Sequence, residues 1–403
     1  MYMNIALVNS EYPSPTGKDH GGIATYVYTM ANALADAGHC VHVCARNNTL
    51  PDKLNDKVIF HTFKYSPVQT PFTFLSRRFN GRIYWEKGCS QSLLECIHAI
   101  HEKTPLDAVE IPEYNGLASQ FSSPQPFPVI INFHTPTILI DKLNLTPATK
   151  QRRRWYTYEK NALKNADAFR CPSKALAARL TGLFSLPQEE ISIIRNPIPT
   201  TFFDVIRKRQ SRPPKRCEIL FSGRLERRKG AEIILRIICK ILAIDPSIHV
   251  TFAGETEMGE SASYRLAIER AVGHENRERI WFLGPQDRER LSLLLCRSDI
   301  FIMPSLFENA PYTLLEAMAA QLPVIGADTG GISEIIEHNE TGLLFSPDTP
   351  EELCACIREY ITKPDLRNNL AARAYNYVKK TFNPAEIAQQ SVAFYSSVKE
   401  KKQ

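Results

Sequence analysis

The sequence predicts an α/β protein built from two doubly wound parallel sheets, one in each half of the chain. Short apolar runs alternate with helical stretches through all 403 residues, which is the pattern of a Rossmann-like domain. The chain is too long for one compact core, so two domains of nearly 200 residues each are expected. A basic, proline-rich stretch at residues 197–216 predicts the linker between them.

Six apolar runs in the first half are predicted strands: residues 4–8, 41–45, 58–63, 108–111, 129–133 and 191–194. Helical spacing over residues 23–37 predicts the first helix. The loop His20-Gly21-Gly22 precedes that helix, and His134 follows the fifth strand. Loops at such strand ends face the ligand crevice of a parallel sheet. A glycine pair can also only form a turn, and a single histidine is often structural.

Five runs in the second half are predicted strands: residues 218–222, 249–253, 280–283, 299–303 and 324–325. Four of them end in a glycine or a proline, in the sequences FSGR, FAGE, FLGP and IMPS. Small or turn-forming residues at successive strand ends let a ligand approach the backbone along one edge of the sheet. Helical spacing over residues 384–402, after the capping residue Asn383, predicts the last helix.

Glu308 and Glu316 stand on either side of a predicted helix start, where Pro311 fits the first helical position. The N-terminus of a helix carries unpaired N–H groups and a partial positive charge, which favour phosphate. Two solvated glutamates on a surface helix would give the same spacing. The strands before and after this helix favour a ligand site, with a diphosphate between two groups that carry hydroxyls. This is the outline of a nucleotide sugar.

Residues 223–230, Gly-Arg-Leu-Glu-Arg-Arg-Lys-Gly, follow the first strand of the second half and open its first helix. Arginine can contact two phosphate oxygens at once, and lysine supplies a compact charge. Arg224 and Lys229 therefore suit a phosphate leaving group on which negative charge grows. A basic turn facing water is the alternative, and the Glu308/Glu316 helix in the same sheet favours the functional interpretation.

The formal net charge of +6 is mild and is partly concentrated in the basic run at residues 207–216. Most simply this run is a solvated linker. With the run Arg152-Arg153-Arg154-Trp155-Tyr156 it also suits peripheral contact with an anionic membrane. No RNA-binding signature or basic recognition helix accompanies the charge, so no nucleic-acid partner is expected.

No apolar run is long enough to span a bilayer, and the chain starts directly in a strand pattern, so we expect a cytoplasmic protein. Many of the ten cysteines lie in or beside apolar runs, as reduced structural thiols do. None has the spacing of a zinc site. No Asp-x-Asp sequence occurs, which removes the usual carboxylate cradle for a divalent ion on a nucleotide sugar.

Three segments resemble the retaining family 4 glycosyltransferases of the GT-B fold, also called glycosyl transferases group 1. They are GGIATYVYTMANALADAGHCVHV, SGRLERRKG and FENAPYTLLEAMAAQLPVIGADTGGISEIIEHNETGLLF. The resemblance covers nearly the whole chain. It implies two Rossmann-like domains facing each other across a cleft, with the acceptor side in residues 1–196 and the donor side in residues 217–383. It also implies that the helix of residues 384–403 crosses back to the first domain.

The same resemblance assigns roles to single residues. Arg224 and Lys229 would hold the donor diphosphate, Glu308 the transferred sugar and Glu316 the ribose hydroxyls. With His134 near the donor sugar, the implied catalytic set is Glu308, Arg224, Lys229 and His134. The implied donor-binding set is Gly21, Gly22, Gly223, Leu283, Asn309, Ala310, Tyr312, Thr313 and Glu316. Many relatives carry glycine where Pro311 stands here, so one backbone donor to phosphate is missing.

The implied activity is a metal-independent hexosyl transfer with retained anomeric configuration. The donor would be a nucleotide-diphosphate sugar, with UDP preferred, and no other cofactor is expected. The acceptor would be a hydroxyl of a bacterial polysaccharide, a lipid-linked molecule or a natural product. Two alternatives remain open from the sequence: a nucleotide-sugar epimerase of the same fold, and a non-catalytic sugar-nucleotide-binding protein.

Overall fold

The structure, a computed structural model, describes residues 2–9, 21–46, 55–64, 73–122, 124–208 and 216–402. His20 and residues 209–215 of the predicted linker lie outside the described residues. Contacts divide the chain into two units. Unit 1 comprises Met1–Pro197 and Pro384–Gln403, and unit 2 comprises Ile198–Asn383. The C-terminal segment is therefore part of unit 1 although unit 2 precedes it in the sequence.

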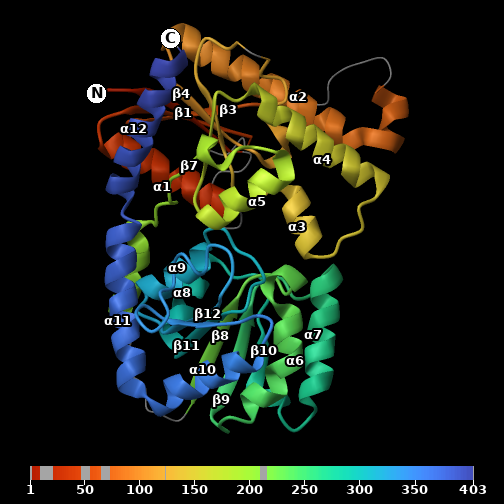
Figure 1. The fold of residues 1–403 in the computed structure, drawn as a ribbon, viewed down its shortest axis with the longest axis vertical. Coiled ribbons are helices and arrows are strands. Elements are labelled where there is room, and N and C mark those ends of the chain that lie inside the picture. Colours follow the sequence, from red (N-terminus) through yellow and green to blue (C-terminus); the bar gives the residue numbers. More distant parts are fainter. Residues whose placement is uncertain are drawn as a thin grey trace. The chain divides into compact units, whose positions relative to one another are not determined.

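Unit 1 contains a 7-stranded sheet in the order β3-β2-β1-β4-β5-β6-β7 (Figure 1). Every pair of neighbouring strands is parallel. The strands are β1 (Asn4–Asn9), β2 (Cys40–Ala45), β3 (Val58–Thr62), β4 (Ala108–Pro112), β5 (Val129–Asn132), β6 (Ala168–Cys171) and β7 (Ile191–Ile193). The α-helices are α1 (Gly22–Asp36), α2 (Thr73–Lys103), α3 (Thr137–Leu143), α4 (Lys150–Ala162), α5 (Lys174–Phe184) and α12 (Pro384–Lys402). Helix α12 packs against α1.

Unit 2 contains a 6-stranded parallel sheet in the order β10-β9-β8-β11-β12-β13. The strands are β8 (Cys217–Ser222), β9 (Ile248–Ala253), β10 (Ile280–Phe282), β11 (Ile300–Met303), β12 (Val324–Ala327) and β13 (Leu343–Phe345). The helices are η4 (Thr200–Lys208), η5 (Arg227–Lys229), α6 (Ala231–Leu242), α7 (Gly259–Val272), η6 (Arg277–Arg279), α8 (Arg288–Arg297), α9 (Tyr312–Ala319), α10 (Glu351–Thr362) and α11 (Pro364–Thr381). The two predicted parallel-sheet domains are confirmed.

The core of unit 2 has two layers because successive side chains of a strand point to opposite faces of the sheet. Ile219 and Phe221 of β8 lie in one apolar cluster with residues of α6, α7 and α10. Leu220, between them, lies in the other cluster with residues of α8, α9 and α11. Both faces are covered by helices, as a parallel sheet requires. Only the strand ends and the loops after them can therefore face a ligand.

Part of the predicted linker belongs to the core of unit 2, which corrects the sequence-based boundary. Ile198 is fully buried and Phe202 is 4% exposed, and both lie in the apolar cluster on the α9 face. The Ile198 N–H also donates to the carbonyl of Phe382, 3.1 Å away. The proline and charge content of residues 197–216 obscured these two apolar anchors.

Strands β6 and β13 lie outside the predicted strands. Strand β6 carries Arg170 between Phe169 and Cys171, and this charge interrupts the apolar run that predicts a strand. Strand β13 has only 3 residues. Pro311 is the N-cap of α9 with extended φ/ψ, and Tyr312 is the first helical residue, so the helix starts one position later than expected. None of the helices in the described part of the chain could cross a membrane.

Candidate functional site

The loops after β8 and β11 meet at the point where the strand order of unit 2 reverses. Strand β8 pairs with β9 on one side and with β11 on the other. Ligands of doubly wound sheets bind at the carboxyl ends of two such strands. The loop after β8 is residues 223–230, called here the Arg224 loop. The loop after β11 is residues 304–311, called here the Glu308 loop.

The two loops are joined by a cluster of charged side chains. The Lys229 ammonium lies 2.5 Å from Oε1 of Glu308, and Nη1 of Arg228 lies 3.3 Å from the same oxygen. Arg228 also donates to the carbonyl of Phe307 at 3.3 Å and, through Nη2, to Oε1 of Glu226 at 2.8 Å. The structure thus brings together Lys229 and Glu308, as the sequence analysis expected. It adds Arg228, which that analysis did not select.

Burial and the two cations act in opposite directions on the Glu308 carboxyl, which is 8% exposed. Burial alone would raise its pKa, but Lys229 and Arg228 outweigh burial and hold the pKa below the usual value. Burial lowers the pKa of Lys229, with Arg228 adding to this effect against the attraction of Glu308. The carboxylate is therefore ionised at neutral pH and is held by two cations.

Close backbone contacts fix the position of the Glu308 loop. A Cβ on Gly230 would lie 2.0 Å from the Pro304 carbonyl oxygen, and one on Gly331 would lie 1.7 Å from that of Asn309. The Gly331 N–H donates to the Glu308 carbonyl at 2.7 Å. The glycines on both sides are needed because the loop leaves no space for a side chain.

Arg224 has a different environment from Lys229. Its side chain is 58% exposed, and Nη2 lies 3.4 Å from Oε1 of Glu226. Glu226 thus contacts both Arg224 and Arg228, so it connects the exposed arginine to the buried cluster. Gly223, with φ of +151°, lets the chain turn between β8 and Arg224. A long, exposed guanidinium beside this cluster can reach a bound anion.

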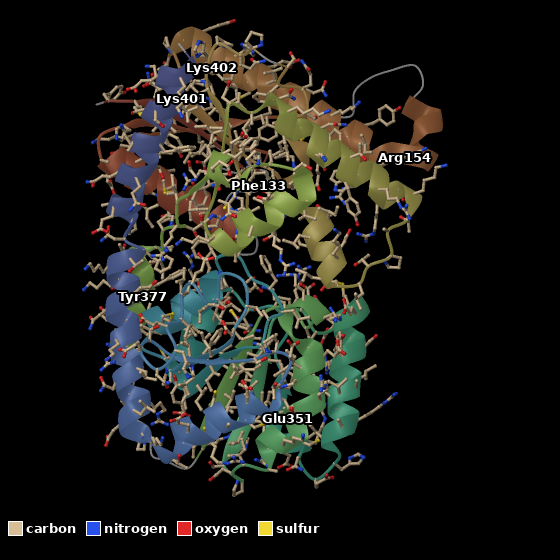
Figure 2. The ribbon with its side chains drawn as sticks, in the orientation of Figure 1. Phe133, Arg154, Glu351, Tyr377, Lys401 and Lys402 are labelled. Carbon is tan, nitrogen blue, oxygen red and sulfur yellow. The ribbon has the colours of Figure 1, made fainter. Side chains whose placement is uncertain are left out.

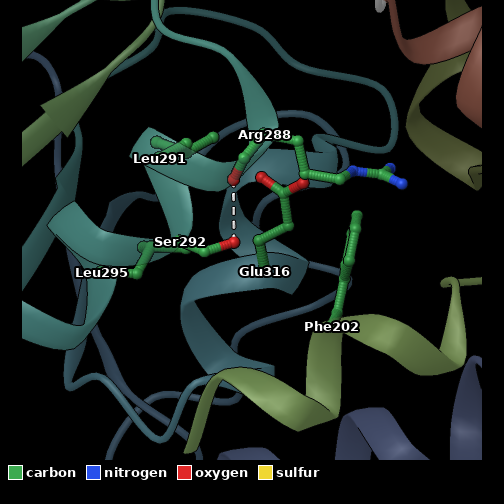
Figure 3. Close-up of a pocket in the computed structure, with 6 residues that line it drawn as sticks. All are labelled: Phe202, Arg288, Leu291, Ser292, Leu295 and Glu316. Carbon is green, nitrogen blue, oxygen red and sulfur yellow. Dashed lines mark hydrogen bonds between the residues drawn. The ribbon is translucent and has the colours of Figure 1, made fainter. Parts of the chain in front are cut away.

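Glu316 lies one turn inside α9, in a small recess lined by Phe202, Arg288, Leu291, Ser292, Leu295 and Glu316 itself. In Figure 3 its side chain points from α9 toward Arg288 at the start of α8. Burial raises the pKa of Glu316 to about 7, and Arg288 only partly opposes this effect. Among the described residues, no hydrogen bond or ion pair to the Glu316 carboxylate is found. It is therefore available to accept hydrogen bonds from a ligand.

The other donor-side residues also lie at the carboxyl edge of the sheet in unit 2. Asn309 is 6% exposed, and Ala310, Tyr312 and Thr313 are half-buried at the start of α9. Leu283 directly follows β10, and its side chain is 43% exposed. Among the described residues, no group of three or more His, Cys, Asp or Glu side chains is arranged to hold a metal ion.

Unit 1 carries Gly21, Gly22 and His134. Gly21 is the exposed N-cap of α1, and a Cβ placed on it would meet no atom within 4 Å. Packing within unit 1 therefore does not require glycine there. His134 follows β5, and its backbone N–H donates to Oε2 of Glu113 at 2.9 Å. Burial lowers the pKa of His134 to about 4, so the ring is neutral at pH 7.

A buried polar network lies near His134, and the sequence analysis missed its central residue, Arg170. Oε2 of Glu110 lies 2.9 Å from Nη1 of Arg170, which is fully buried, and accepts from the Tyr395 hydroxyl of α12 at 2.5 Å. Oε1 of Glu110 accepts from the Tyr26 hydroxyl at 2.6 Å, and the Tyr26 ring meets the His134 ring edge-on at 5.5 Å. The sequence signal for this network was the arginine in strand β6, because a charge buried within an apolar strand must be paired.

Comparisons with known proteins agree with this geometry. The family model "Glycosyltransferase Family 4" matches residues 20–202, and "Glycosyl transferases group 1" matches residues 202–377. Glycogen synthase from Mycobacterium tuberculosis is 24% identical over 409 residues, covering 98% of this chain and 95% of that protein.

Among solved structures, sucrose-phosphate synthase from Thermosynechococcus elongatus has a TM-score of 0.77 at 22% identity, covering 99% of this chain and 100% of that one. Anabaena HepE in complex with UDP has a TM-score of 0.71 at 18% identity, covering 98% and 100%. These likenesses confirm the GT-B fold class. Together, the two family matches, the fold and the charged cluster at the strand ends identify the chain as a glycosyltransferase of family 4, glycosyl transferases group 1.

Proposed function

We propose that this glycosyltransferase moves a hexosyl unit from a UDP-sugar to an acceptor hydroxyl, with retained anomeric configuration and without a metal ion. The observation that carries the proposal is the ion pair between Lys229 and Glu308, 2.5 Å apart, at the strand ends where the sheet of unit 2 reverses its order. A cation and a carboxylate held there can bind the diphosphate and the sugar hydroxyls of a nucleotide-diphosphate sugar.

The proposal gives each charged residue a role that suits its position. In this proposal the diphosphate contacts the Lys229 ammonium and the exposed Arg224 guanidinium, and the N–H groups after Glu308 contact phosphate oxygens. These preorganised positive charges stabilise the negative charge that grows on the leaving diphosphate. Glu308, still held by Arg228, orients the hydroxyls of the transferred sugar. Glu316 accepts hydrogen bonds from the ribose.

If the anomeric configuration is retained, the acceptor hydroxyl attacks the anomeric carbon from the same face that the diphosphate leaves. The acceptor hydroxyl forms the new bond to the anomeric carbon as the bond to the diphosphate breaks. A phosphate oxygen then accepts the proton of that hydroxyl. Glu308 serves as an orienting group in this scheme, and no covalent sugar–enzyme intermediate is formed. The anomeric configuration of the product, read by NMR, tests this step, and an inverted product would overturn it.

The UDP complex of HepE supports uridine as the base. A panel of UDP- and GDP-sugars tests it by thermal stabilisation. A ligand at 100 times its dissociation constant stabilises the folded protein by about 2.7 kcal/mol. We expect UDP-sugars to raise the melting temperature and GDP-sugars to have little effect at the same concentration. The reverse order would overturn the choice of base.

A second measurement separates the proposed transfer from the two alternatives. Incubation of the donor with enzyme alone would convert it to another nucleotide sugar in an epimerase, which NMR would detect. Release of UDP that depends on an acceptor mixture is the expected result for a transferase. A binding protein would give neither product.

The proposed site of action is the cytoplasm, with acceptors among bacterial polysaccharides, lipid-linked molecules and natural products.

A further inference from the structure

A second cavity lies inside unit 1, where α2, α3 and α4 meet, and is called here the unit 1 cavity. Its described lining is Arg82 and Ile83 of α2, Thr137 of α3, and Gln151, Arg152 and Trp155 of α4. The cavity is partly open to solvent and has a volume of about 230 Å³. A single water needs about 10–15 Å³ of such space. The cavity can therefore hold a group of many heavy atoms.

One wall of the cavity is a guanidinium lying over an indole ring. The Arg82 guanidinium lies 4.1 Å from the centroid of the Trp155 ring. Its Nη2 donates to Oδ1 of Asn115 at 3.0 Å. Among the described residues Arg82 forms no salt bridge, so its charge is not neutralised by direct contact with a carboxylate. Trp155 is 6% exposed and therefore forms a rigid base for this cation.

The rest of the described lining carries a second guanidinium and two neutral polar groups. Arg152 pairs with Asp141, which also accepts from the Tyr156 hydroxyl at 2.6 Å, so the position of Arg152 is fixed. Gln151 is exposed, and its amide has no partner among the described residues. Thr137 Oγ1 donates to Oε1 of Glu159 at 2.8 Å. None of the described lining residues carries a carboxylate. The carboxylates beside the lining are Asp141 on Arg152, Glu159 on Thr137, and Glu86 and Glu159 within electrostatic reach of Arg82.

The cavity shares a turn of the chain with His134. The residues after β5 run from His134 through Thr135 to Thr137, which opens α3. Glu113 accepts from the backbone N–H groups of His134 and Thr135, at 2.9 and 2.8 Å, and so fixes this turn. A ligand in the cavity would therefore contact the same turn that carries the histidine placed in the catalytic set.

We propose that the unit 1 cavity binds a phosphate group of the acceptor substrate. The inference rests on the proposed transferase function and adds the chemical class of its acceptor. Two guanidiniums from separate helices can each contact phosphate oxygens, which is the geometry for which arginine is favoured. A neutral sugar would not require two positive charges. The phosphate can belong to a free sugar phosphate or to a lipid-linked acceptor, and both have the chemistry that the cavity recognises.

Equilibrium binding to the full chain tests the proposal with defined probes. The probes are glucose 6-phosphate, glucose, and vesicles of phosphatidylcholine with and without phosphatidylinositol. We expect binding of at least one phosphate-bearing probe and none of glucose or of phosphatidylcholine alone. Saturable binding of glucose 6-phosphate indicates a soluble acceptor, whereas binding only to the phosphatidylinositol vesicles indicates a lipid acceptor.

Variants locate this binding in the cavity. Arg82→Gln and Arg152→Gln should each weaken it about tenfold or more, because a charge-assisted hydrogen bond is lost. Gln151→Ala should weaken this binding less, and among the described residues it removes no side-chain hydrogen bond or ion pair. Arg154→Gln is the matched control, since Arg154 is an exposed arginine of the same helix that does not line the cavity (Figure 2). Equal weakening in the control, or wild-type binding in both cavity arginine variants, would overturn the proposal.

UDP binding to each variant keeps this test separate from that of the transferase. None of the four substituted residues belongs to the donor-binding or catalytic set, so the affinity for UDP should stay at the wild-type value. Normal UDP binding with loss of phosphate-probe binding supports the acceptor site. Normal UDP binding and turnover, with glucose bound as tightly as glucose 6-phosphate, would refute the acceptor class and leave the transferase assignment intact.

Discussion

Lys229 is the side chain whose removal should most directly lower turnover. Lys229→Ala removes the cation that lies 2.5 Å from Glu308 and that we assign to the diphosphate. Loss of one preorganised charged donor typically lowers kcat by about 10²–10³. Arg224→Ala should have an effect of the same order with less change in stability, because its side chain is 58% exposed. Steady-state kinetics on the preferred UDP-sugar measures both.

Arg227→Ala is the control for these two variants. Arg227 lies in the same loop, but its guanidinium pairs with Glu232 of α6 at 3.2 Å, outside the cluster around Glu308. The Arg227→Ala variant should retain near wild-type kcat. Near-normal turnover of both Lys229→Ala and Arg224→Ala would refute the roles assigned to them.

Glu316 should make donor affinity depend on pH. Its pKa is raised to about 7, so the carboxylate ionises between about pH 6 and pH 8. Hydrogen bonds from ribose hydroxyls are stronger to an ionised carboxylate, so UDP-sugar affinity should rise across this range. Calorimetric titration at several pH values measures this affinity. Glu316→Gln should flatten the dependence of the affinity on pH. An unchanged profile in that variant would remove Glu316 from the ribose site.

The same shift has a consequence for stability, with the sign set by linkage. The folded state holds the Glu316 proton more tightly than the unfolded state, whose carboxyl titrates near 4.5. The contribution of Glu316 to the free energy of unfolding is therefore largest below pH 4.5, and it is lost as the pH rises toward 7. Glu308 has the opposite sign, since its pKa is lowered. Its contribution is present above its ordinary pKa and is lost in stronger acid.

The loops between strands and helices depend on close backbone contacts, and Gly331 is the clearest case. Gly331→Ala would place a methyl group 1.7 Å from the Asn309 carbonyl oxygen, so the Glu308 loop must move. We expect a loss of about 1–3 kcal/mol in the free energy of unfolding, as for an overpacked site. Turnover should fall as well, because Glu308 shifts with the loop. Urea unfolding and kinetics check both effects.

Gly182→Ala provides the comparison. Gly182 lies within α5, and an added Cβ would meet no atom within 4 Å. Alanine there should raise the free energy of unfolding by about 0.5–1 kcal/mol, because glycine is the poorer helix former. A loss of stability in this variant would contradict the position of α5.

Strand and helix boundaries were predictable where apolar periodicity was clean. Residues 4–8 and 249–253 fall within β1 and β9, since these strands are buried on both faces. Strand β6 was not predicted, because Arg170 breaks the apolar pattern that identifies a strand. That arginine is tolerated only because Glu110 of β4, on the far side of β5, is its partner.

At the level of the complete chain, α12 completes unit 1 although the whole sequence of unit 2 lies between it and the rest of that unit. The Tyr395 hydroxyl donates to Glu110 at 2.5 Å and accepts from Nη1 of Arg170 at 3.3 Å, all within the interior. Tyr395→Phe removes one hydrogen-bond partner from the Glu110 carboxylate and one from the Arg170 guanidinium. It should lower the free energy of unfolding by about 1–3 kcal/mol. Hydrogen exchange of the β4 and β6 amides should accelerate in parallel.

Ser397→Ala tests whether that effect is specific to the network. Ser397 is an exposed residue of the same helix, and its hydroxyl donates only locally to the Phe394 carbonyl at 2.8 Å. Its removal should change stability by less than about 0.5 kcal/mol. If Tyr395→Phe has no larger effect than this control, the network does not stabilise the attachment of α12.

The order of residues along the chain was sufficient to predict two parallel-sheet domains and the loops at their strand ends. These two predictions are confirmed because periodicity, turn residues and loop placement are local properties that the backbone expresses directly. The roles given to Lys229 and Glu308 stay predictions. The spacing of Glu308 from Arg228, the burial of Arg170 and the unit 1 cavity required the folded chain. Each depends on segments far apart in sequence whose distances are set by strand pairing and helix packing, and no local pattern encodes those distances.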